Sequence, residues 1–282
     1  MENKMTGKTV LVTGANSGVG KVTARELAKM GATVVMVARS RERGEQALAQ
    51  VKAGSGSSDV TLMLCDLSSQ QSIRDFAEQF RAAHDRLHVL VNNAGAIFGR
   101  RHESVDGYEM TFALNHMGYF LLTNLLLDLL QASAPARIVN VASTAHTVGP
   151  VDFDDLQRQT GYSPMQVYGQ SKMMNILFTN ELARRLKGTG VTANSLHPGF
   201  VRSNFGRRQN GIFGRLLMPL AQLFAISEEA GAKTQVYLAS SPEVEGMTGL
   251  YFDKCKSVKT HPFAQDEAAQ ERLWDVSETA VL

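Results

Sequence analysis

The chain has 282 residues, of which 44% are hydrophobic and 20% are charged, and these values are ordinary for a globular protein with one large α/β domain. A net charge of +2, without any run of Lys and Arg, argues against a nucleic-acid-binding protein. The two cysteines, Cys65 and Cys255, form no CxxC pair, so neither disulfides nor a zinc site are expected.

No stretch of the sequence has the pattern of a membrane span or of a secretory signal. The N-terminus passes directly from polar residues into an expected strand, and the most apolar stretches are interrupted by charged or polar residues or by proline. A membrane-spanning helix needs roughly 20 mostly apolar residues. We therefore expect a cytoplasmic protein without a transmembrane segment.

Short β-rich runs alternate with longer helical patterns along the whole chain, which is typical of a parallel sheet with helices on both faces. We expect strands at residues 9–13, 33–38, 60–64, 89–92, 138–141, 192–196 and 249–252. We expect helices at residues 19–30, 41–51, 69–83, 108–130, 163–187, 227–239 and 266–276. Ser68 and Gln71 have the spacing of a capping box for the third helix. No repeat or linker divides the chain, so the pattern predicts one α/β domain over residues 1–282, a doubly wound parallel sheet of about seven strands in a single-domain Rossmann fold.

The first expected strand runs into the sequence TGANSGVG, residues 13–20, at the start of a helix. Glycines permit a tight turn there, and main-chain amides at a helix N-terminus can hold a pyrophosphate. The spacing differs from G-x-G-x-x-G, and glycines also cluster in ordinary turns, but the position after the first strand favours a nucleotide site. The candidate cofactor contacts in this turn are Gly14, Asn16, Ser17, Gly18, Val19 and Gly20.

The second expected strand ends at Arg39. In dinucleotide sites an acidic residue at this place selects NAD, whereas an arginine accommodates the 2′-phosphate of NADP. A guanidinium binds phosphate through two hydrogen bonds and stacks on adenine. The neighbouring Arg41 and Arg43 are at least partly explained as the solvated start of a helix. We therefore expect NADP(H) as the preferred cofactor, with NAD(H) as the alternative.

Two further segments follow strands and are candidates for cofactor contacts. Asp66 and Leu67 come directly after the third strand, where the Asp66 carboxylate could accept a hydrogen bond from an adenine amino group or act in a turn before Ser68. These two alternatives stay open. The fourth strand leads into NNAG, whose small residues allow a ligand to approach the main chain. Its candidate contacts are Asn93, Ala94 and Gly95.

The sequence YGQSK places Tyr168 and Lys172 four residues apart, on one face of an expected helix. A solvated helix face would have the same spacing. Ser143, however, stands at the carboxyl end of the fifth strand, where open α/β sheets bind their ligands. This third residue favours a catalytic group over a chance pairing.

Together, TGANSGVG, NNAG, Asn115 in LNHMGYF, Ser143 in NVAST, YGQSK and HPGFVRS resemble the short-chain dehydrogenase/reductase family in their order and spacing. The segments LNHMGYFLLTNLLLDLL and ERLWDVS most resemble its retinol dehydrogenase and lipophilic-carbonyl reductase branch. The resemblance implies hydride transfer between NADP(H) and a small hydrophobic alcohol, aldehyde or ketone. It also implies a homodimer or homotetramer that assembles through two helices, one of which bears Tyr168.

The resemblance also implies roles for individual residues. Tyr168 would be the general acid/base, Ser143 would bind the substrate oxygen, and Asn115 would hold a water that links Lys172 to solvent. Tyr168 and Lys172 would both contact the cofactor, Lys172 through the nicotinamide ribose. The positive charge of Lys172 would lower the pKa of the Tyr168 phenol from its ordinary value near 10. The HPGFVRS segment would add cofactor contacts at Pro198, Gly199, Val201 and Ser203.

The segment at about 204–226 would form a mobile lid over the substrate. Its apolar residues fall at helical spacing, and Phe213 and Leu217 are the expected substrate contacts. A peripheral contact with a membrane is also expected here, and a pair of core-packing helices is the alternative. His146 stands three residues after Ser143 and either lines the substrate pocket or simply lies in a loop.

Other functions fit the sequence less well. A protochlorophyllide-reductase-like enzyme, or another reductase of this family acting on a C=C bond or a polar carbonyl, shares the motif set. A sugar-nucleotide epimerase reuses Tyr-x-x-x-Lys but normally needs a longer C-terminal region. A catalytically silent nucleotide sensor would be expected to lack Tyr168 or Lys172. His84 and His88 are four residues apart, but His88 opens a strand, so we expect no metal.

Overall fold

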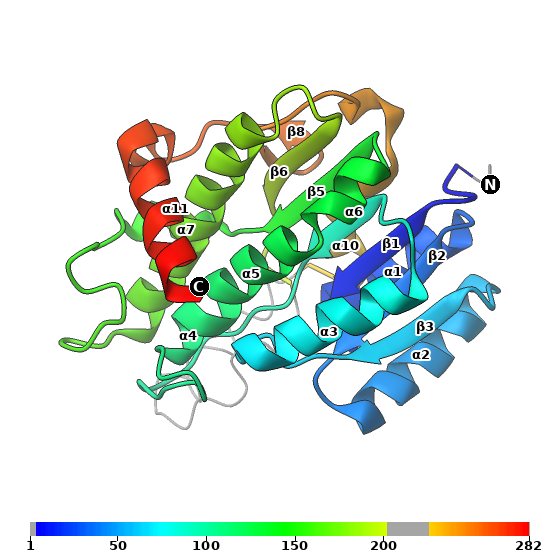
Figure 1. The fold of residues 1–282 in the computed structure, drawn as a ribbon, viewed down its shortest axis with the longest axis horizontal. Helices are drawn as coiled ribbons and strands as arrows, with labels where there is room; N and C mark the ends of the chain where they lie inside the picture. The colour runs from blue at the N-terminus through cyan, green and yellow to red at the C-terminus, as the bar shows by residue number, and fades with distance from the viewer. Residues whose placement is uncertain (1–3, 202–225, 282) are drawn as a thin grey trace.

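The computed structural model describes residues 4–201 and 226–281, which form three layers, a central sheet with helices on both faces (Figure 1). Within these residues the sheet has eight strands in the order β3-β2-β1-β4-β5-β6-β7-β8. The strands are β1 Thr9–Thr13, β2 Thr33–Ala38, β3 Val60–Leu64, β4 Val89–Asn92, β5 Ala136–Val141, β6 Val191–His197, β7 Tyr251–Asp253 and β8 Lys256–Ser257. The seven from β1 to β7 are parallel, and β8 pairs antiparallel with β7. The doubly wound fold is therefore confirmed, and β8, with two residues, is too short to leave a sequence pattern.

Most predicted helices are present with shifts of a few residues at their ends. They are α1 Gly18–Lys29, α2 Arg41–Ser55, α3 Gln70–Ala83, α7 Pro164–Arg185, α10 Glu228–Ser240 and α11 Glu267–Val281. Within the two described ranges, none of the helices has both the length and the apolar character needed to cross a membrane.

The helix predicted at residues 108–130 is present but is interrupted by a π-helical turn and again at Leu126. The segment is divided into α4 Met110–Phe112, a π-helical turn Ala113–Met117, α5 Gly118–Leu125 and α6 Leu127–Ala132. Residues 118–123 are all buried, so the hydrophobic pattern has no period from which the break could be read. A Cβ atom on Gly118 would lie 2.6 Å from the carbonyl oxygen of Leu67, which shows how closely α5 packs on the loop before α3.

The predicted capping box of α3 is also wrong. Ser69 is the N-cap, and its side chain accepts a hydrogen bond from the amide of Ser72. Ser68 is unavailable because its hydroxyl and its amide both donate to Asp66 Oδ1, at 2.6 and 3.0 Å. The nearby aspartate therefore shifts the cap by one residue.

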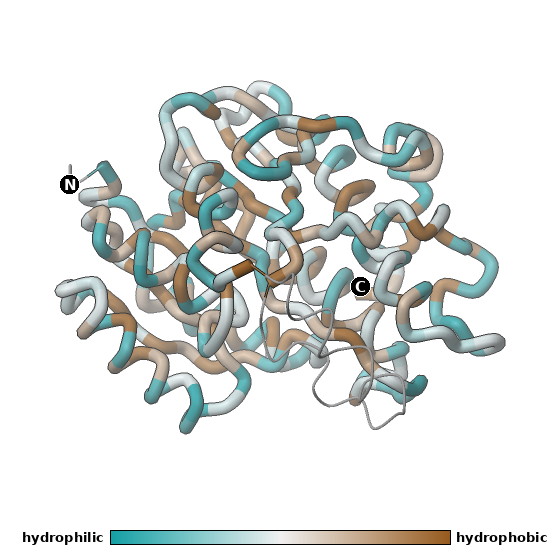
Figure 2. The backbone as a smooth tube through the Cα atoms, turned by 180° about the vertical axis from the view of Figure 1, so that it is seen from behind, coloured by the Kyte–Doolittle hydropathy of each residue, from teal (hydrophilic) through white to brown (hydrophobic). Residues whose placement is uncertain are grey.

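The side chains of the central strands enter two cores, one on each face of the sheet. Leu11 and Val35 pack with α3, α5 and α7, whereas Val10 and Val34 pack with α1, α2 and α10. All four are fully buried, because alternate residues of a strand point to opposite faces and both faces are covered. Hydrophobic residues therefore lie inside the molecule, while hydrophilic residues prevail on the outer turns of the helices (Figure 2).

The C-terminal helix α11 packs against α7 and α5. The ring of Trp274 stacks on Phe178 of α7, at 5.9 Å between centroids, and meets the edge of Phe120 of α5 at 5.0 Å. His116, in the π-helical turn, lies with Nε2 2.7 Å from the Ser277 hydroxyl, and both residues are buried. The end of the chain therefore supports the helix that bears Tyr168 and the turn that bears Asn115.

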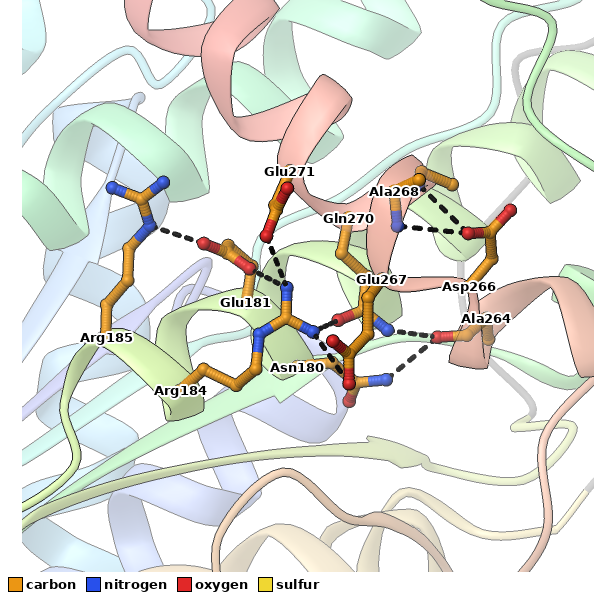
Figure 3. A network of polar contacts seen from close by, with 11 residues as sticks. Asn180, Glu181, Arg184, Arg185, Ala264, Asp266, Glu267, Ala268, Gln270 and Glu271 are labelled. Carbon is orange, nitrogen blue, oxygen red and sulfur yellow. Dashed lines mark hydrogen bonds and ion pairs between the residues drawn. The ribbon is translucent and has the colours of Figure 1, made fainter.

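A polar network continues this contact between α7 and α11 (Figure 3). Arg184 donates to Gln270 Oε1 at 2.6 Å and pairs with Glu181 on its own helix. Glu267 and Glu271 lie 3.7 and 3.9 Å from the same guanidinium. One arginine thus joins two helices through several partners, which orients α11 along α7.

Trp274→Ala should lower the free energy of unfolding by about 3–5 kcal/mol, because it removes a large buried ring from the contact between α11, α7 and α5. Urea unfolding followed by circular dichroism measures the change. Asp275→Ala, at an exposed position on the same helix, is the matched control and should change stability by less than about 0.5 kcal/mol. Equal stabilities of the two variants would show that α11 does not brace the fold.

Candidate active site

The candidate site lies at the carboxyl ends of β1, β4, β5 and β6, which are adjacent in the sheet. These ends lead respectively into the glycine turn, the NNAG segment, Ser143 and the His-Pro-Gly segment. Parallel strands end at the same edge of a sheet, so these segments meet there although they are far apart in sequence.

The glycine turn lies directly against the NNAG segment. A Cβ atom on Gly14 would stand 2.9 Å from the Cα atom of Ala94, and one on Gly20 would stand 2.4 Å from Asn93 Nδ2. Gly14 also has a φ angle of +65°, which side chains other than glycine rarely adopt. Glycine is therefore required at both positions for the two segments to form one surface.

The remaining turn residues predicted to bind the cofactor lead into α1. Asn16 and Ser17 precede the helix, and Gly18 and Val19 open it. Ser17 is the N-cap, yet its side chain makes no capping hydrogen bond. Main-chain amides at such a helix start suit a phosphate group.

A buried hydrogen-bond chain, absent from the sequence predictions, joins the first turn to the NNAG segment. Thr13 Oγ1 accepts hydrogen bonds from the amides of Asn93 and Ala94, at 2.8 and 3.0 Å. Asn93 Nδ2 donates to the Thr13 carbonyl at 2.8 Å, and Asn93 Oδ1 accepts from Gln235 of α10 at 3.0 Å. Gln235 in turn accepts from Thr23 of α1. The predicted residue Asn93 thus links the ends of β1 and β4 to α10 and, through Gln235, to α1.

The HPGFVRS segment meets the glycine turn at α10. At Gly231, a Cβ atom would lie 2.5 Å from Val201 Cγ2, 3.0 Å from Val19 Cγ2 and 3.2 Å from the Pro198 carbonyl oxygen. Gly199 has a φ angle of +87°. The structure therefore brings the predicted cofactor residues Val19, Pro198, Gly199 and Val201 to one place.

Arg39 and Asp66 lie together beyond β2 and β3. Arg39 Nη1 is 3.6 Å from Asp66 Oδ2, and the arginine side chain is 57% exposed. The other carboxylate oxygen of Asp66 accepts from Ser68, so the structure shows the turn role that the sequence left open. The contact with adenine stays a prediction. Leu67, the next predicted contact, has a buried side chain.

Ser143 and Tyr168 form the centre of the site. Ser143 follows β5 and is the N-cap of a 3₁₀ turn, Thr144–Val148, where its Oγ accepts from the amide of Ala145 at 3.2 Å. Tyr168 lies on α7, half-buried, and its side chain hydrogen-bonds that of Ser143. Ser143 at the end of β5 and Tyr168 on α7 are therefore next to each other, as the sequence predicted.

Lys172 is 2% exposed and donates from Nζ to the main-chain carbonyl of Val141 at 3.0 Å. Asn175 Nδ2 donates to the same carbonyl at 3.2 Å. The ammonium lies 5.5 Å from the ring centroid of Tyr168 and 5.8 Å from that of Tyr119. Val141 acts only through its main chain and could not be predicted from the sequence. Asn175 was not predicted either, although its spacing of three residues after Lys172 was a usable signal.

Asn115 holds the loop after β4 against α7. Its Oδ1 accepts from the amide of Ala96 at 2.9 Å, and its Nδ2 donates to the Ala96 carbonyl and to the Ser171 hydroxyl, at 2.9 and 3.0 Å. A Cβ atom on Gly95 would lie 3.3 Å from Asn115 Oδ1 and 3.4 Å from Lys172 Nζ. The predicted residues Gly95, Asn115 and Lys172 are thus neighbours, and the water-holding role of Asn115 stays a prediction.

Burial sets the protonation of the two central groups. It raises the pKa of Tyr168 to about 12, and the hydrogen bond with Ser143 only partly opposes it. It also lowers the pKa of Lys172 to about 7. The family resemblance implied that the lysine charge lowers the pKa of the phenol. In the protein alone the direction is the opposite, because loss of water disfavours both charged forms.

The residues predicted to contact substrate are not brought together by the described structure. His146 is 3% exposed, and both of its ring nitrogens face main-chain groups, the Ser143 carbonyl and the His261 amide. Phe213 and Leu217, the cofactor candidate Ser203, and the lid predicted at about 204–226 up to residue 225 lie outside the described residues.

The arrangement suits proton transfer to or from an oxygen atom, beside a surface that fits a dinucleotide. A phenol and a serine hydroxyl share one hydrogen bond, and a lysine that titrates near neutral pH lies one helical turn away. Gly18 leaves the main chain open at the start of α1, because its φ angle is +58° and only Glu228, at 4.0 Å, would come near a Cβ atom there, as close approach of a pyrophosphate requires.

Lys172→Met should change how stability depends on pH. Unfolding restores the ordinary lysine pKa of 10.5, so between pH 7 and 10.5 the unfolded chain binds more protons than the folded protein, whose Lys172 pKa is about 7. The unfolding free energy of the parent should therefore rise by about 3 kcal/mol from pH 7 to 9.5 relative to that of the variant. Urea unfolding at several pH values measures it. Lys233→Met, at an exposed position, should show the same dependence of unfolding free energy on pH as the parent. If the parent and Lys172→Met also show the same dependence, burial does not lower the pKa of Lys172.

Sequence similarity relates this chain to a known family. The short chain dehydrogenase family matches residues 8–211. Retinol dehydrogenase 14 from Homo sapiens is 46% identical over 98% of this chain and 87% of its own length. Retinol dehydrogenase 12 from Mus musculus is 46% identical over 96% of this chain and 85% of its own length.

Two solved structures are similar to this chain in fold and in sequence. An uncharacterised protein from Mycobacterium paratuberculosis superposes with a TM-score of 0.80 at 34% identity, covering 98% of this chain and 94% of that one. The NADP complex of Pseudomonas aeruginosa RhlG superposes with a TM-score of 0.71 at 28% identity, covering 94% and 99%. The chain therefore belongs to the short-chain dehydrogenase/reductase family of oxidoreductases, and within it is similar to the retinol dehydrogenases.

Proposed function

We propose that this protein is an NADP(H)-dependent enzyme that interconverts a hydrophobic alcohol and its aldehyde or ketone, with Tyr168 as the general acid/base. The observation that carries the proposal is the hydrogen bond between Tyr168 and Ser143 beside the buried ammonium of Lys172. The similarity to retinol dehydrogenases 14 and 12 supports a lipophilic substrate.

In the direction of reduction, Tyr168 donates its phenolic proton to the carbonyl oxygen of the substrate. A pKa of about 12 keeps the phenol protonated at neutral pH, so the protein alone is prepared to act as an acid. The Ser143 hydroxyl binds the same oxygen and holds it within reach of the phenol. A bound nicotinamide dinucleotide supplies the hydride, or accepts it in the reverse direction.

Lys172 replaces the proton that Tyr168 gives up. Its pKa of about 7 allows it to gain and lose a proton at neutral pH. Its charged form also favours the phenolate left after the transfer, because an ammonium stabilises a nearby anion. Asn115 bonds the Ala96 main chain on one side and the Ser171 hydroxyl of α7 on the other, and so holds the loop after β4 beside the Lys172 ammonium.

Arg39 supports the preference for NADP(H). Its ion pair with Asp66, at 3.6 Å, is long for a charge-assisted hydrogen bond, and the side chain is more than half exposed, so the guanidinium can turn toward a 2′-phosphate. The glycine turn, the NNAG segment and residues 198–201 would hold the rest of the dinucleotide. The NADP complex of the similar RhlG is consistent with this choice.

Several parts of the proposal concern assembly and location. α11 covers the face of α7 that bears Phe178, so a homodimer or homotetramer built on α7 would have to use another face of this helix. The substrate contacts at Phe213 and Leu217, the membrane contact through the segment at about 204–226, and a cytoplasmic location stay predictions.

Tyr168→Phe should lower kcat by roughly 100- to 10,000-fold, because the variant has no proton to give to the substrate oxygen, while NADPH binding changes little. The assay is NADPH oxidation with retinal, a steroid ketone, a long-chain aldehyde and a quinone, together with fluorescence titration of NADPH. Tyr237→Phe, which removes an exposed phenol bonded to Glu243, is the control and should keep the parent rate. A variant as active as the parent would overturn the role of Tyr168. A parent that reduces only polar carbonyls or C=C bonds would overturn the substrate class.

Arg39→Asp should weaken NADPH binding by roughly 10- to 100-fold and leave NADH binding unchanged or tighter, because it removes the partner of the 2′-phosphate and supplies a partner for a 2′-hydroxyl. Titrations with both cofactors measure this. Arg86→Asp makes the same change of charge where Arg86 donates to the Ala132 carbonyl, away from β2, and should alter neither affinity. An unchanged cofactor preference in Arg39→Asp would disprove the assignment.

A further inference from the structure

The peptide group between Ser143 and Thr144 is held by a histidine on each side. His146 Nδ1 lies 2.7 Å from the Ser143 carbonyl oxygen, and His197 Nδ1 accepts a hydrogen bond from the Thr144 amide at 3.3 Å. The carbonyl and the amide belong to one planar trans peptide, so they point in opposite directions. The two imidazoles therefore restrain the same plane from opposite edges.

The partners of each ring define its tautomer. A carbonyl oxygen only accepts, so His146 Nδ1 must carry the hydrogen, and its bare Nε2 accepts from the His261 amide at 3.3 Å. His197 must have a bare Nδ1 to accept from Thr144. The two residues thus need opposite tautomers, and both must be neutral for their contacts to exist. Burial lowers the pKa of each ring, which favours the neutral form.

The plane they hold sets the position of the Ser143 hydroxyl. Ser143 has φ and ψ angles of −167° and 157°, and its Oγ accepts from the Ala145 amide at 3.2 Å. Rotation of the peptide plane changes ψ of Ser143 and moves the Ala145 amide away from Oγ. The hydroxyl would then lose the hydrogen bond from Ala145 that fixes its rotamer, and could turn away from Tyr168.

We propose that His146 and His197 are positioning residues that clamp the Ser143–Thr144 peptide and so hold the Ser143 hydroxyl against Tyr168. The inference rests on the proposed function, since the Ser143 hydroxyl is the substrate-binding group there. It gives His146 a role different from both alternatives left open by the sequence, a substrate contact or a place in a loop. His146 reaches the clamp from the 3₁₀ turn and is itself fixed by the segment after β8, whereas His197 stands at the end of β6. Both supports are therefore parts of the rigid fold.

Substitutions that keep or remove one hydrogen-bonding atom test the clamp at each position. His146→Asn retains a donor near the place of Nδ1, whereas His146→Asp, of almost equal size, offers only acceptors to the Ser143 carbonyl. His197→Asn retains an acceptor for the Thr144 amide, whereas His197→Leu has none. We expect His146→Asp and His197→Leu to lower kcat for NADPH-dependent reduction of all-trans-retinal by roughly 10- to 100-fold. The two asparagine variants should stay within about threefold of the parent, and the dissociation constant of NADPH should change by less than about threefold in His146→Asp.

A third histidine provides the matched control. His88 Nδ1 accepts from the Thr9 amide at 3.0 Å, the same kind of bond as that of His197, but at the amino end of the sheet. His88→Leu should lower the melting temperature without lowering kcat. If it lowers kcat as much as His197→Leu does, the loss reflects stability alone. Full activity of His146→Asp, or equal loss in His146→Asn and His146→Asp, would also overturn the clamp.

A measurement without turnover separates this inference from the proposed function. Long-range ¹H–¹⁵N spectra of the histidine-labelled protein report the tautomer of each ring, and single substitutions assign the signals. The clamp requires hydrogen on Nδ1 of His146 and on Nε2 of His197 at pH 7.5. The reverse tautomer at either position would refute it even in an active enzyme. The expected tautomers in a protein that reduces no carbonyl would uphold the clamp and refute the proposed function.

Discussion

The rest of the active site depends on one buried contact, the hydrogen bond from Lys172 Nζ to the main-chain carbonyl of Val141. An ammonium that leaves water loses several kcal/mol of hydration, and one carbonyl with two nearby aromatic rings returns only part of it. This imbalance explains why the pKa of Lys172 falls to about 7. The same exclusion of water raises the pKa of Tyr168 to about 12. At neutral pH the Tyr168 phenol therefore stays protonated, while the neighbouring Lys172 can gain and lose a proton.

The surrounding fold keeps this unfavourable arrangement from relaxing. Asn175 shares the Val141 carbonyl with Lys172, and Asn140 of β5 donates to Thr179, so three residues along α7 are tied to one strand. On the outer side, α11 covers the same helix through Trp274 and the arginine network of Figure 3. A helix fixed on both sides cannot turn its lysine out to solvent. The proposed clamp likewise fixes the Ser143 peptide from two sides, at the strand end that faces Tyr168.

The differences between the predicted and observed features have specific physical causes. The strands and most helices were predictable because apolar runs and periodic patterns are local properties. The interruptions of the helix predicted at residues 108–130, at the π-helical turn Ala113–Met117 and at Leu126, were not, since residues 118–123 are all buried and show no polar face. The N-cap of α3 is Ser69 and not the predicted Ser68, because Ser68 donates both of its hydrogen bonds to Asp66. His146 was near enough in sequence to Ser143 to be noticed, but only its contacts with two main-chain groups reveal a positioning role.

The sequence by itself determined the order of strands and helices along the chain, the glycines that allow the first turn to form, and the set of groups available for chemistry, because each of these depends on neighbours in the chain. Tertiary structure decided which of those groups act together. The carbonyl of Val141, the chain from Thr13 through Asn93 to Gln235, and the opposed rings of His146 and His197 are contacts between atoms that only folding brings close. Several of these are main-chain atoms, which every residue possesses and no sequence pattern distinguishes. The direction of the Tyr168 pKa shift was settled in the same way, because desolvation is a property of the packed surroundings and not of the residue or its spacing from Lys172.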